Sequence, residues 1–134
     1  MRAAAVVLAV GVVVSGWSAP AVSAEPVAPP EVPDAEGVVF TDSTSIVDPR
    51  PLPVESWSRA SDDRAVAVHF TSGTPPCNGV HATTHETAEA VTVTLTSGSL
   101  PAVAGRMCKM LAVTGTLDVP LGSPLGDRQV LSAS

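Results

Sequence analysis

The sequence predicts an all-β protein, in the form of a small antiparallel β-sandwich or open barrel with one disulfide. Segments in the second half of the chain alternate apolar and polar side chains with a period of two, as expected for strands with one buried face. Turn sequences rich in Gly, Pro and Ser separate these segments, at 72–76, 97–101 and 120–126. The chain of 134 residues holds a single pair of cysteines. Short strands at this spacing indicate one domain, which we place at residues 56–134.

Ahead of that domain, residues 1–24 are expected to be a secretory signal peptide. Arg2 precedes an apolar run from Ala3 to Val14. A run of about a dozen residues is shorter than the ~20 that a membrane span needs, but it fits the apolar core of a secretory signal. Val22 and Ala24 then supply small residues at a cleavage site, so we predict cleavage after Ala24.

Two alternatives accompany this signal. Cleavage after Ala21 is a second choice, and an uncleaved N-terminal segment would retain the protein at the membrane. A bacterial lipid anchor needs a cysteine shortly after the apolar run, where this chain has Trp17. We therefore expect a secreted, extracellular protein that has no stable membrane anchor after cleavage.

Residues 25–55 are expected to be an acidic, proline-rich linker that is extended and mostly disordered. The stretch carries seven acidic residues against the single base Arg50, and it has seven prolines. Proline removes backbone donors and favours extended conformations. A charged segment with few large apolar groups also buries too little surface to offset its chain entropy. Gly37 to Phe40 is its one apolar spot, and the sequence leaves open whether Val38 to Phe40 dock on the domain.

Within residues 56–134, three period-2 segments predict strands. Their apolar faces are formed by Val66, Val68 and Phe70, by Val91, Val93 and Leu95, and by Leu111, Val113, Leu117 and Val119. Gly115 interrupts the third row, which suggests a bulge or a close approach of another part of the chain. Trp57 lies just ahead of the first of these strands and is expected to plug the core.

Cys77 and Cys108 are expected to form a structural disulfide. They are the only cysteines in a chain that is expected to reach an oxidising compartment. The loop that they close would contribute roughly 3–4 kcal/mol to stability, which is a large share for a small domain with few aromatic residues. A redox-active pair would instead have adjacent thiols, such as Cys-x-x-Cys at a helix start.

The stretch HATTHETAE, from His81 to Glu89, holds two of the three histidines. In a helix, His81 and His85 would lie ~6 Å apart on one face and would suit a zinc ion. In a strand the same two residues share a face but lie ~13 Å apart. The period-2 alternation from Val80 to His85 favours the strand, with a hairpin connection at 87–90.

The third histidine, His69, alternates with the apolar row of the first strand and is therefore expected to face solvent. We expect a solvated polar face that bears all three histidines, with no cofactor. The alternative is an exported protein that binds a metal weakly and unselectively through His69, His81 and His85.

The sequence lacks the motifs of several enzyme classes. It has no Gly-x-Ser-x-Gly elbow, no phosphate-binding loop and no dinucleotide fingerprint. A thin core also leaves little room for a deep ligand pocket. The net charge of −6 argues against nucleic acid and anionic lipid as partners, because both need clusters of Lys and Arg. We therefore expect no enzymatic activity and name no catalytic residue.

The C-terminal stretch from Pro124 to Leu131 reads as a turn followed by a last strand. Asp127 and Arg128 are adjacent, so in a strand they would point to opposite faces. We expect Arg128 to pair with a carboxylate on a neighbouring strand, which would fix the register of a small domain. The functional alternative is a surface charge pair, Asp127 and Arg128, that contacts a ligand.

These features also suggest a family. The order of Trp57, Cys77, Glu86-Thr87, Val91-Thr92-Val93, Cys108, Leu117-Asp118 and Pro124 to Arg128 resembles small exported or lipid-anchored β-domain proteins of high-GC actinobacteria. The resemblance covers residues 56–134 and the Ala/Val/Pro-rich signal fits it, whereas Trp17 departs from the lipidation cysteine that many members carry. Because most members have no known function, the resemblance implies a fold and a compartment. We expect a non-catalytic envelope or extracellular module that binds a protein, glycan or small ligand through loops on a rigid scaffold.

Overall fold

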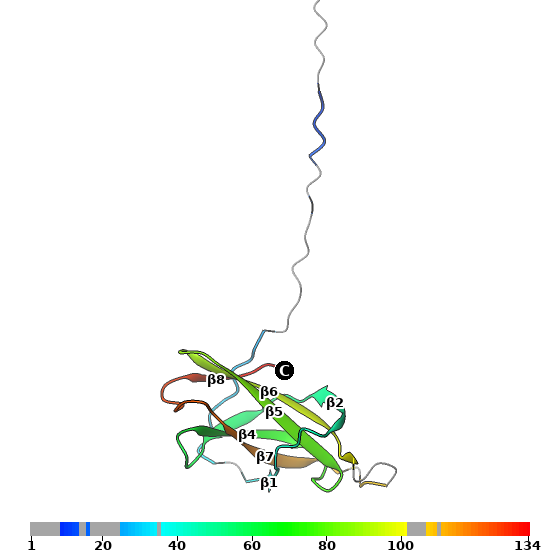
Figure 1. Cartoon of the computed structure of the whole chain (residues 1–134), viewed down its shortest axis with the longest axis vertical. Helices are drawn as coiled ribbons and strands as arrows, with labels where there is room; N and C mark the ends of the chain where they lie inside the picture. Colours follow the sequence, from blue (N-terminus) through cyan, green and yellow to red (C-terminus); the bar gives the residue numbers. More distant parts are fainter. Residues whose placement is uncertain (1–8, 14–15, 17–24, 35, 102–106, 110) are drawn as a thin grey trace, which may run out of the picture.

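The computed structural model describes residues 9–13, 16, 25–34, 36–101, 107–109 and 111–134. Within these residues the chain forms strands and no α-helix. The strands are β1 (Val38–Val39), β2 (Val47–Pro51), β3 (Ser56–Arg59), β4 (Ala65–Ser72), β5 (Asn78–Glu86), β6 (Ala90–Ser99), β7 (Val113–Pro120) and β8 (Gln129–Ser132). They form two sheets with the core between them (Figure 1). The predicted all-β class is confirmed, and the sheets do not close into a barrel.

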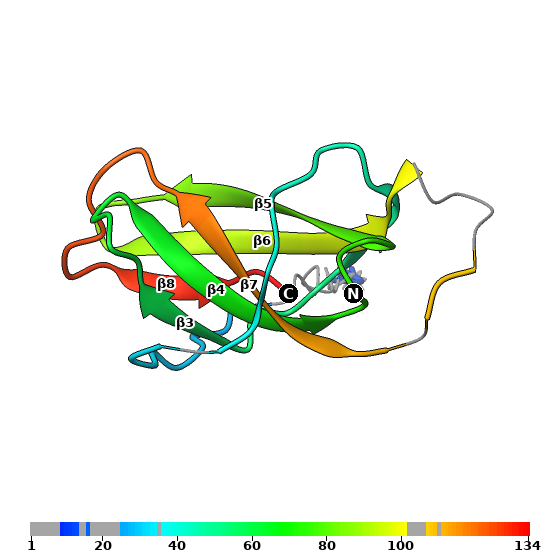
Figure 2. The ribbon, with the colours of Figure 1, turned by 90° about the horizontal axis from the view of Figure 1, so that it is seen from below.

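The two sheets are of mixed direction. The first sheet has the order β1-β7-β4-β3, and the second has the order β2-β6-β5 with β8 also beside β6 (Figure 2). Most neighbours are antiparallel, but β1 runs parallel to β7 and β8 runs parallel to β6. This corrects the purely antiparallel sheets that the sequence predicts. Both parallel pairs join segments that are distant in the sequence, because a tight turn cannot connect parallel strands.

The core consists of the inward-facing side chains of both sheets. Val66, Val68 and Phe70 of β4 and Val91, Val93 and Leu95 of β6 are all fully buried. Trp57 pairs with Val68 across β3 and β4 and is only 6% exposed, so the prediction that it plugs the core is confirmed.

Gly115 lies where two aromatic rings approach the backbone of β7. A Cβ atom at this position would lie 2.6 Å from ring carbons of both Phe40 and Phe70. These rings pack edge to face, with their centroids 5.2 Å apart. The close approach that the sequence suggests at this glycine is therefore confirmed, and it brings the N-terminal part of the chain against β7.

The disordered linker predicted for residues 25–55 is wrong for the residues described there. This stretch contains β1 and β2, and Phe40 and Val54 are 5% and 6% exposed in the core. The question left open by the sequence is thus answered, because Phe40 docks. Backbone hydrogen bonds hold much of this stretch against the strands. An extended chain rich in proline is compatible with the edge of a sheet. Packing therefore begins upstream of Ser56.

Residues 25–34 and 36–43, which we call the N-terminal segment from here on, contact both sheets in turn. Val27 exchanges two backbone hydrogen bonds with Ser132 of β8 (2.8 and 2.7 Å). The Trp57 N–H in β3 then donates to the carbonyl of Pro30 (3.1 Å), and the N–H of Val32 donates to the carbonyl of Trp57 (2.8 Å). After β1, the N–H of Ser43 donates to the carbonyl of Val80 in β5 (2.8 Å). The segment therefore touches an edge of each sheet and links the two layers.

The disulfide between Cys77 and Cys108 is present, as predicted, with its Cα atoms 6.0 Å apart. Cys77 directly precedes β5, and Cys108 lies in the connection between β6 and β7. The bond thus fastens that connection to the start of the second sheet. Most of the predicted signal peptide lies outside the described residues. In the part of the chain that the structure describes, no helix has the length and hydrophobicity to cross a membrane.

Candidate interaction site

The HATTHETAE stretch forms a strand and a hairpin, as predicted. Its histidines lie in β5, which pairs with β6 so that His81, Thr83 and His85 lie opposite Thr96, Thr94 and Thr92. These six side chains share the outer face of the second sheet, while Val80 points inward and is fully buried. The N–H of Thr87 donates to the carbonyl of Ala90 (2.8 Å) and closes the hairpin.

The predicted face with three histidines is wrong. His81 and His85 lie on β5 in the second sheet, whereas His69 lies on β4 in the first sheet and is only 3% exposed. Alternation in the sequence identifies the face of a strand, but it does not identify the sheet to which the strand belongs. Within the described ranges, no group of three or more His, Cys, Asp or Glu residues is arranged to hold a metal ion.

His69 is hydrogen-bonded to Ser58 through Nε2 on the outer face of the first sheet. Both side chains are 3% exposed, although their strand positions turn them away from the core. The chain runs from Glu31, beside β3, to Val38 in β1 at the opposite edge of this sheet. Asp34 lies on this path and is within electrostatic reach of His69. The path of the N-terminal segment thus accounts for the burial.

The environment of His69 keeps its imidazole neutral. Burial lowers the pKa of His69, and the charges of Asp34 and Asp118 oppose that effect. Nδ1 of His69 is buried with no hydrogen-bond partner among the described residues. A hydrogen-bonded serine and histidine form a nucleophile pair only where a substrate reaches the hydroxyl, and Ser58 is too deeply buried for that. We interpret the pair as structural.

Asp42 caps the beginning of the β5 edge. One carboxylate oxygen accepts a hydrogen bond from the backbone N–H of Ala82 (2.8 Å). Nδ1 of His81 lies 3.0 Å from both carboxylate oxygens and donates to this group. Asp42 therefore occupies the backbone donor that a neighbouring strand would otherwise use at Ala82, and it holds the His81 ring on the outer face.

The other sheet edges are closed or blunted by the chain itself. In the first sheet, the backbone of Pro30 to Val32 lies along β3, and β1 lies along the beginning of β7. In the second sheet, Val27 bonds to β8. The outer edge of β2 carries Pro49 and Pro51 and a register shift, and prolines and bulges prevent further strand pairing. Beyond Thr116, the N–H and carbonyl of Asp118 also face away from β4 without a backbone partner among the described residues, but this stretch is short because Pro120 has no N–H.

The second half of β5 differs from these edges because its outward backbone groups are open. Ser43 and Asp42 occupy the groups of Val80 and Ala82, so the even-numbered residues of β5 face away from β6. Among the described residues, the carbonyl of Ala82 and both the N–H and the carbonyl of Thr84 and of Glu86 have no backbone partner. We call the stretch Ala82–Glu86 the open β5 edge. The sequence did not indicate this open edge. An edge is recognised as open only by comparison with the edges that the N-terminal segment protects, and the sequence did not show where that segment binds.

Arg128 fixes the far end of the open β5 edge, and the carboxylate partner that the sequence predicts for it is Glu86. Nη1 of Arg128 lies 3.0 Å from Oε1 of Glu86, and these side chains are only 11% and 23% exposed. The same guanidinium donates to the carbonyls of Ser123 and Pro124 (3.0 and 2.9 Å). Asp127 is exposed, whereas the Arg128 side chain is largely buried by these contacts.

Glu86 is also bonded to the loop that follows β7. Its Oε2 accepts the backbone N–H of Gly122 (2.8 Å). This backbone hydrogen bond, followed by the contact with Arg128, lowers the pKa of Glu86. Glu86 therefore remains ionised, and the end of β5 is held in place although its backbone edge is open.

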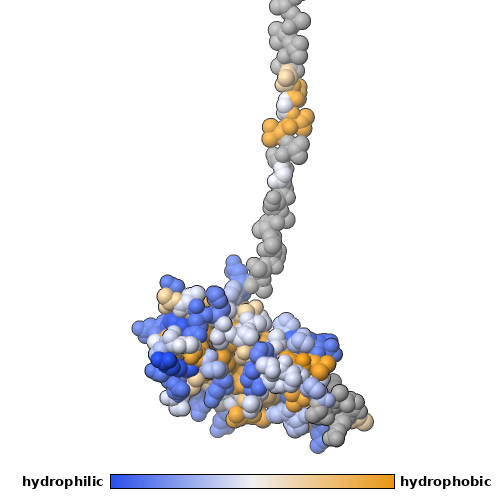
Figure 3. All heavy atoms as spheres, viewed as in Figure 1, coloured by the Kyte–Doolittle hydropathy of each residue, from blue (hydrophilic) through white to orange (hydrophobic). Residues whose placement is uncertain are grey.

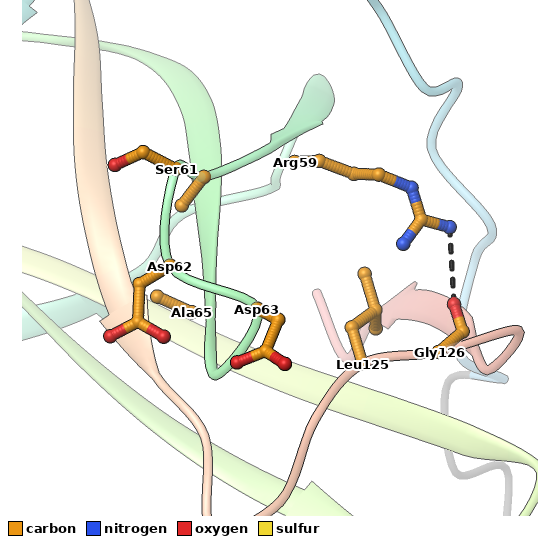
Figure 4. Close-up of a pocket in the computed structure, with 8 residues that line it drawn as sticks. Arg59, Ser61, Asp62, Asp63, Ala65, Leu125 and Gly126 are labelled. Atoms are coloured by element: carbon orange, nitrogen blue, oxygen red, sulfur yellow. Dashed lines mark hydrogen bonds between the residues drawn. The ribbon is translucent and has the colours of Figure 1, made fainter.

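The surface formed by the described residues includes hollows. One, of about 370 Å³, lies where residues 39–42 leave the edge of β7 and contains Asp42 and Asp118. The other, of about 150 Å³, lies beside Arg59 and Leu125 (Figure 4). It is smaller than the ~300 Å³ at which small-molecule sites begin.

The Arg59 side chain of the smaller hollow is engaged within the protein. The Arg59 guanidinium donates to the carbonyl of Gly126 (3.1 Å), as the dashed line in Figure 4 shows. It also pairs with Glu31 (3.2 Å), and it lies 5.8 Å from the centre of the Trp57 ring. Arg59 thus secures the N-terminal segment to β3.

The visible surface of the domain is largely polar, with small and separate apolar patches (Figure 3). The valines of β1 are exposed, Val38 by 41% and Val39 by 77%. No protein-family model matches the chain, and no curated protein or solved structure matches it. The site must therefore be interpreted from its own geometry, which is that of an open strand edge on a rigid sandwich.

Proposed function

We propose that the protein is an exported, non-catalytic interaction module that binds an extended segment of a partner protein at the open β5 edge. In this mode the partner adds a strand to the second sheet. Backbone hydrogen bonds give affinity, and alternate side chains of the added strand give specificity. The disulfide supports export, because such bonds persist in oxidising compartments. The proposal requires no cofactor.

The observation that carries this proposal is the difference between the open β5 edge and the other edges. An open edge is a ready template for pairing with another chain, and proteins usually block such edges. Here the N-terminal segment blocks β3 and β8 with backbone hydrogen bonds, and Asp42 blocks only the beginning of β5. The remaining stretch contains no proline, lysine or register shift that would prevent pairing.

The side chains around the open β5 edge favour a polar or moderately apolar partner segment. Thr83 and His85 are exposed and would contact every second residue of an added strand. On the other face of the strand, Ala82 and Thr84 are half-buried and would contact the alternate residues. The negative charge of Glu86 is already paired with Arg128, so this end of the edge presents little net charge.

A backbone-specific substitution tests the proposal. Thr84→Pro removes the central N–H of the edge, and an edge strand tolerates proline at a position that does not bond to its neighbour. Thr84→Ala changes the side chain but keeps the N–H, and it is the matched control. The immobilised domain would be exposed to a display library of extended peptides. We expect peptides that bind the wild type and Thr84→Ala to lose at least tenfold in affinity for Thr84→Pro. Equal binding by all three would contradict the proposal, provided that Thr84→Pro melts like the control.

A further inference from the structure

We propose that residues 30–34, which we call the β3 latch, detach from the first sheet when His69 takes up a proton, so that mildly acidic conditions uncover the edge of β3. At neutral pH the β3 latch closes this edge through two backbone hydrogen bonds with Trp57. The edge belongs to the first sheet and is separate from the open β5 edge. Its opening is a change of state that a proton drives, and it needs no ligand.

The site of His69 accommodates a neutral imidazole ring. Ser58 is hydrogen-bonded to Nε2, and both side chains are 3% exposed. Nδ1 is buried and has no hydrogen-bond partner among the described residues. An imidazolium ring carries an N–H on both nitrogens, so protonation leaves a positive charge and a donor at Nδ1 without an acceptor. A proton is therefore bound more tightly in a state that admits water to the ring.

Carboxylates beside His69 oppose this effect without cancelling it. Asp34 of the β3 latch and Asp118 of β7 are within electrostatic reach, and both attract an imidazolium. β3 presents only serines on this face, and Glu55, which precedes β3, is bonded to Thr71 (3.0 Å). Burial has the largest influence and lowers the pKa of His69. Uptake of a proton thus favours exposure of the ring over its attraction to Asp34.

Val32 brings the β3 latch over this face of the sheet. Glu31 is paired with Trp57 in a parallel bridge, so strand alternation places Val32 on the face that bears Ser58. Val32 is half-buried there. Detachment of the β3 latch therefore admits water to Ser58 and to the ring of His69 that is bonded to it.

The β3 latch is the part of this cover that opens most easily. β4, which carries His69, lies between two neighbouring strands and has fully buried inward side chains. The β3 latch is held by two backbone bonds and by the ion pair of Glu31 with Arg59, whose side chains are about half exposed. Pro30 and Pro33 have no N–H and can add no donor. A segment with so few bonds opens locally at a lower free-energy cost than the core strands do.

Amide hydrogen exchange at about pH 7.5 and pH 5.5, each with and without ~1 M urea, separates local opening from global unfolding. After correction for intrinsic rates, we expect the protection of Val32 and Trp57 to fall severalfold at the lower pH, by up to about tenfold, with no dependence on urea. Val27, in the same segment but bonded to β8, is the control and should keep its protection. Unchanged or increased protection of Val32 and Trp57, a fall that depends on urea, or an equal fall at Val27 would each overturn the proposal.

Variants identify the group that takes up the proton. His69→Gln keeps a hydrogen-bonding side chain beside Ser58 but cannot be protonated, so the protection of Val32 should no longer depend on pH. His85→Gln, at an exposed position of β5, is the matched control and should behave like the wild type. A pH dependence that survives in His69→Gln would contradict the proposal.

Glu31→Gln tests the β3 latch in a protein that keeps His69. It removes the ion pair with Arg59 and should lower the protection of Val32 at both pH values, while the ratio between the two values stays the same. Loss of that ratio in Glu31→Gln would mean that the Glu31 carboxylate, and not His69, carries the pH dependence. This comparison decides the proposal even if His69→Gln does not fold.

Discussion

Arg128 and Glu86 join the loop after β7 to the end of β5, with Nη1 of Arg128 3.0 Å from Oε1 of Glu86. The two residues lie 42 positions apart in the sequence. Because the guanidinium also binds two loop carbonyls and the carboxylate binds a loop N–H, removing either partner leaves polar groups of the other without their bonds.

We expect Arg128→Ala to destabilise the domain by about 2 kcal/mol, as is typical for a partly buried, hydrogen-bonded charged group. Arg128→Lys should recover only part of this, because an ammonium cannot reproduce the planar fork of the guanidinium. Urea unfolding measures both effects. Asp127→Ala, at the exposed neighbouring position, is the control and should change stability by less than about 0.5 kcal/mol. Similar losses for Asp127→Ala and Arg128→Ala would show that the ion pair has no special role.

His69 predicts a dependence of stability on pH. Burial lowers its pKa in the folded state below the ordinary value near 6.5. The unfolded chain therefore binds a proton at a higher pH than the folded chain does. The resulting contribution is complete above about pH 6.5 and is lost as the pH falls from there through the folded pKa.

The variant His69→Gln should lose this dependence, and His85→Gln, at an exposed position, should keep it. Chemical unfolding at a series of pH values between 7.5 and 5 is the measurement. If the wild type and His69→Gln show the same slope over this range, the burial of a neutral His69 is not what sets the dependence.

Phe40 should behave as a core residue although it lies in an acidic, proline-rich stretch. It is 5% exposed and packs edge to face on Phe70. We expect Phe40→Ala to destabilise the domain by about 3–5 kcal/mol, since a cavity forms between the N-terminal segment and β7. Val39→Ala, at a position that is 77% exposed, is the neighbouring control. A small effect at both positions, measured by thermal unfolding, would mean that this segment is dispensable for folding.

The disulfide should contribute a large part of the stability. The double variant Cys77→Ala/Cys108→Ala opens a loop with a sequence separation of 31, for which the loss is about 3–4 kcal/mol on loop entropy. Met107→Ala, next to Cys108 and fully exposed, serves as the control. Denaturant midpoints of the oxidised wild type and the two variants give the comparison. An unchanged midpoint for the double variant would refute the structural role of the bond.

The strands of the second half could be predicted because the alternation of their apolar and polar side chains indicates which face is buried. Alternation along β4, β6 and β7 identifies the buried faces, and the HATTHETAE stretch forms β5 because its pattern has a period of two. The close approach at Gly115 and the need of Arg128 for a carboxylate partner also follow from residue type. Each of these inferences depends on local chemistry that the sequence displays.

The N-terminal segment could not be predicted in this way because backbone groups hold much of it. Val27 and Val32 bond to strand edges through N–H groups that every residue except proline possesses. The burial of His69 and the opening of the β5 edge both follow from the path of this segment. Asp42 gives no local signal of its role either, since the Ala82 N–H that it caps lies 40 positions away.

Amide hydrogen exchange of the dilute protein, resolved residue by residue, distinguishes the open β5 edge from the closed edges. We expect slow exchange at Val27, Val32 and Trp57, whose N–H groups close the other edges, and fast exchange at Thr84 and Glu86 in the open β5 edge. Slow exchange at Thr84 in the dilute protein, or fast exchange at Val32 and Trp57, would contradict the account.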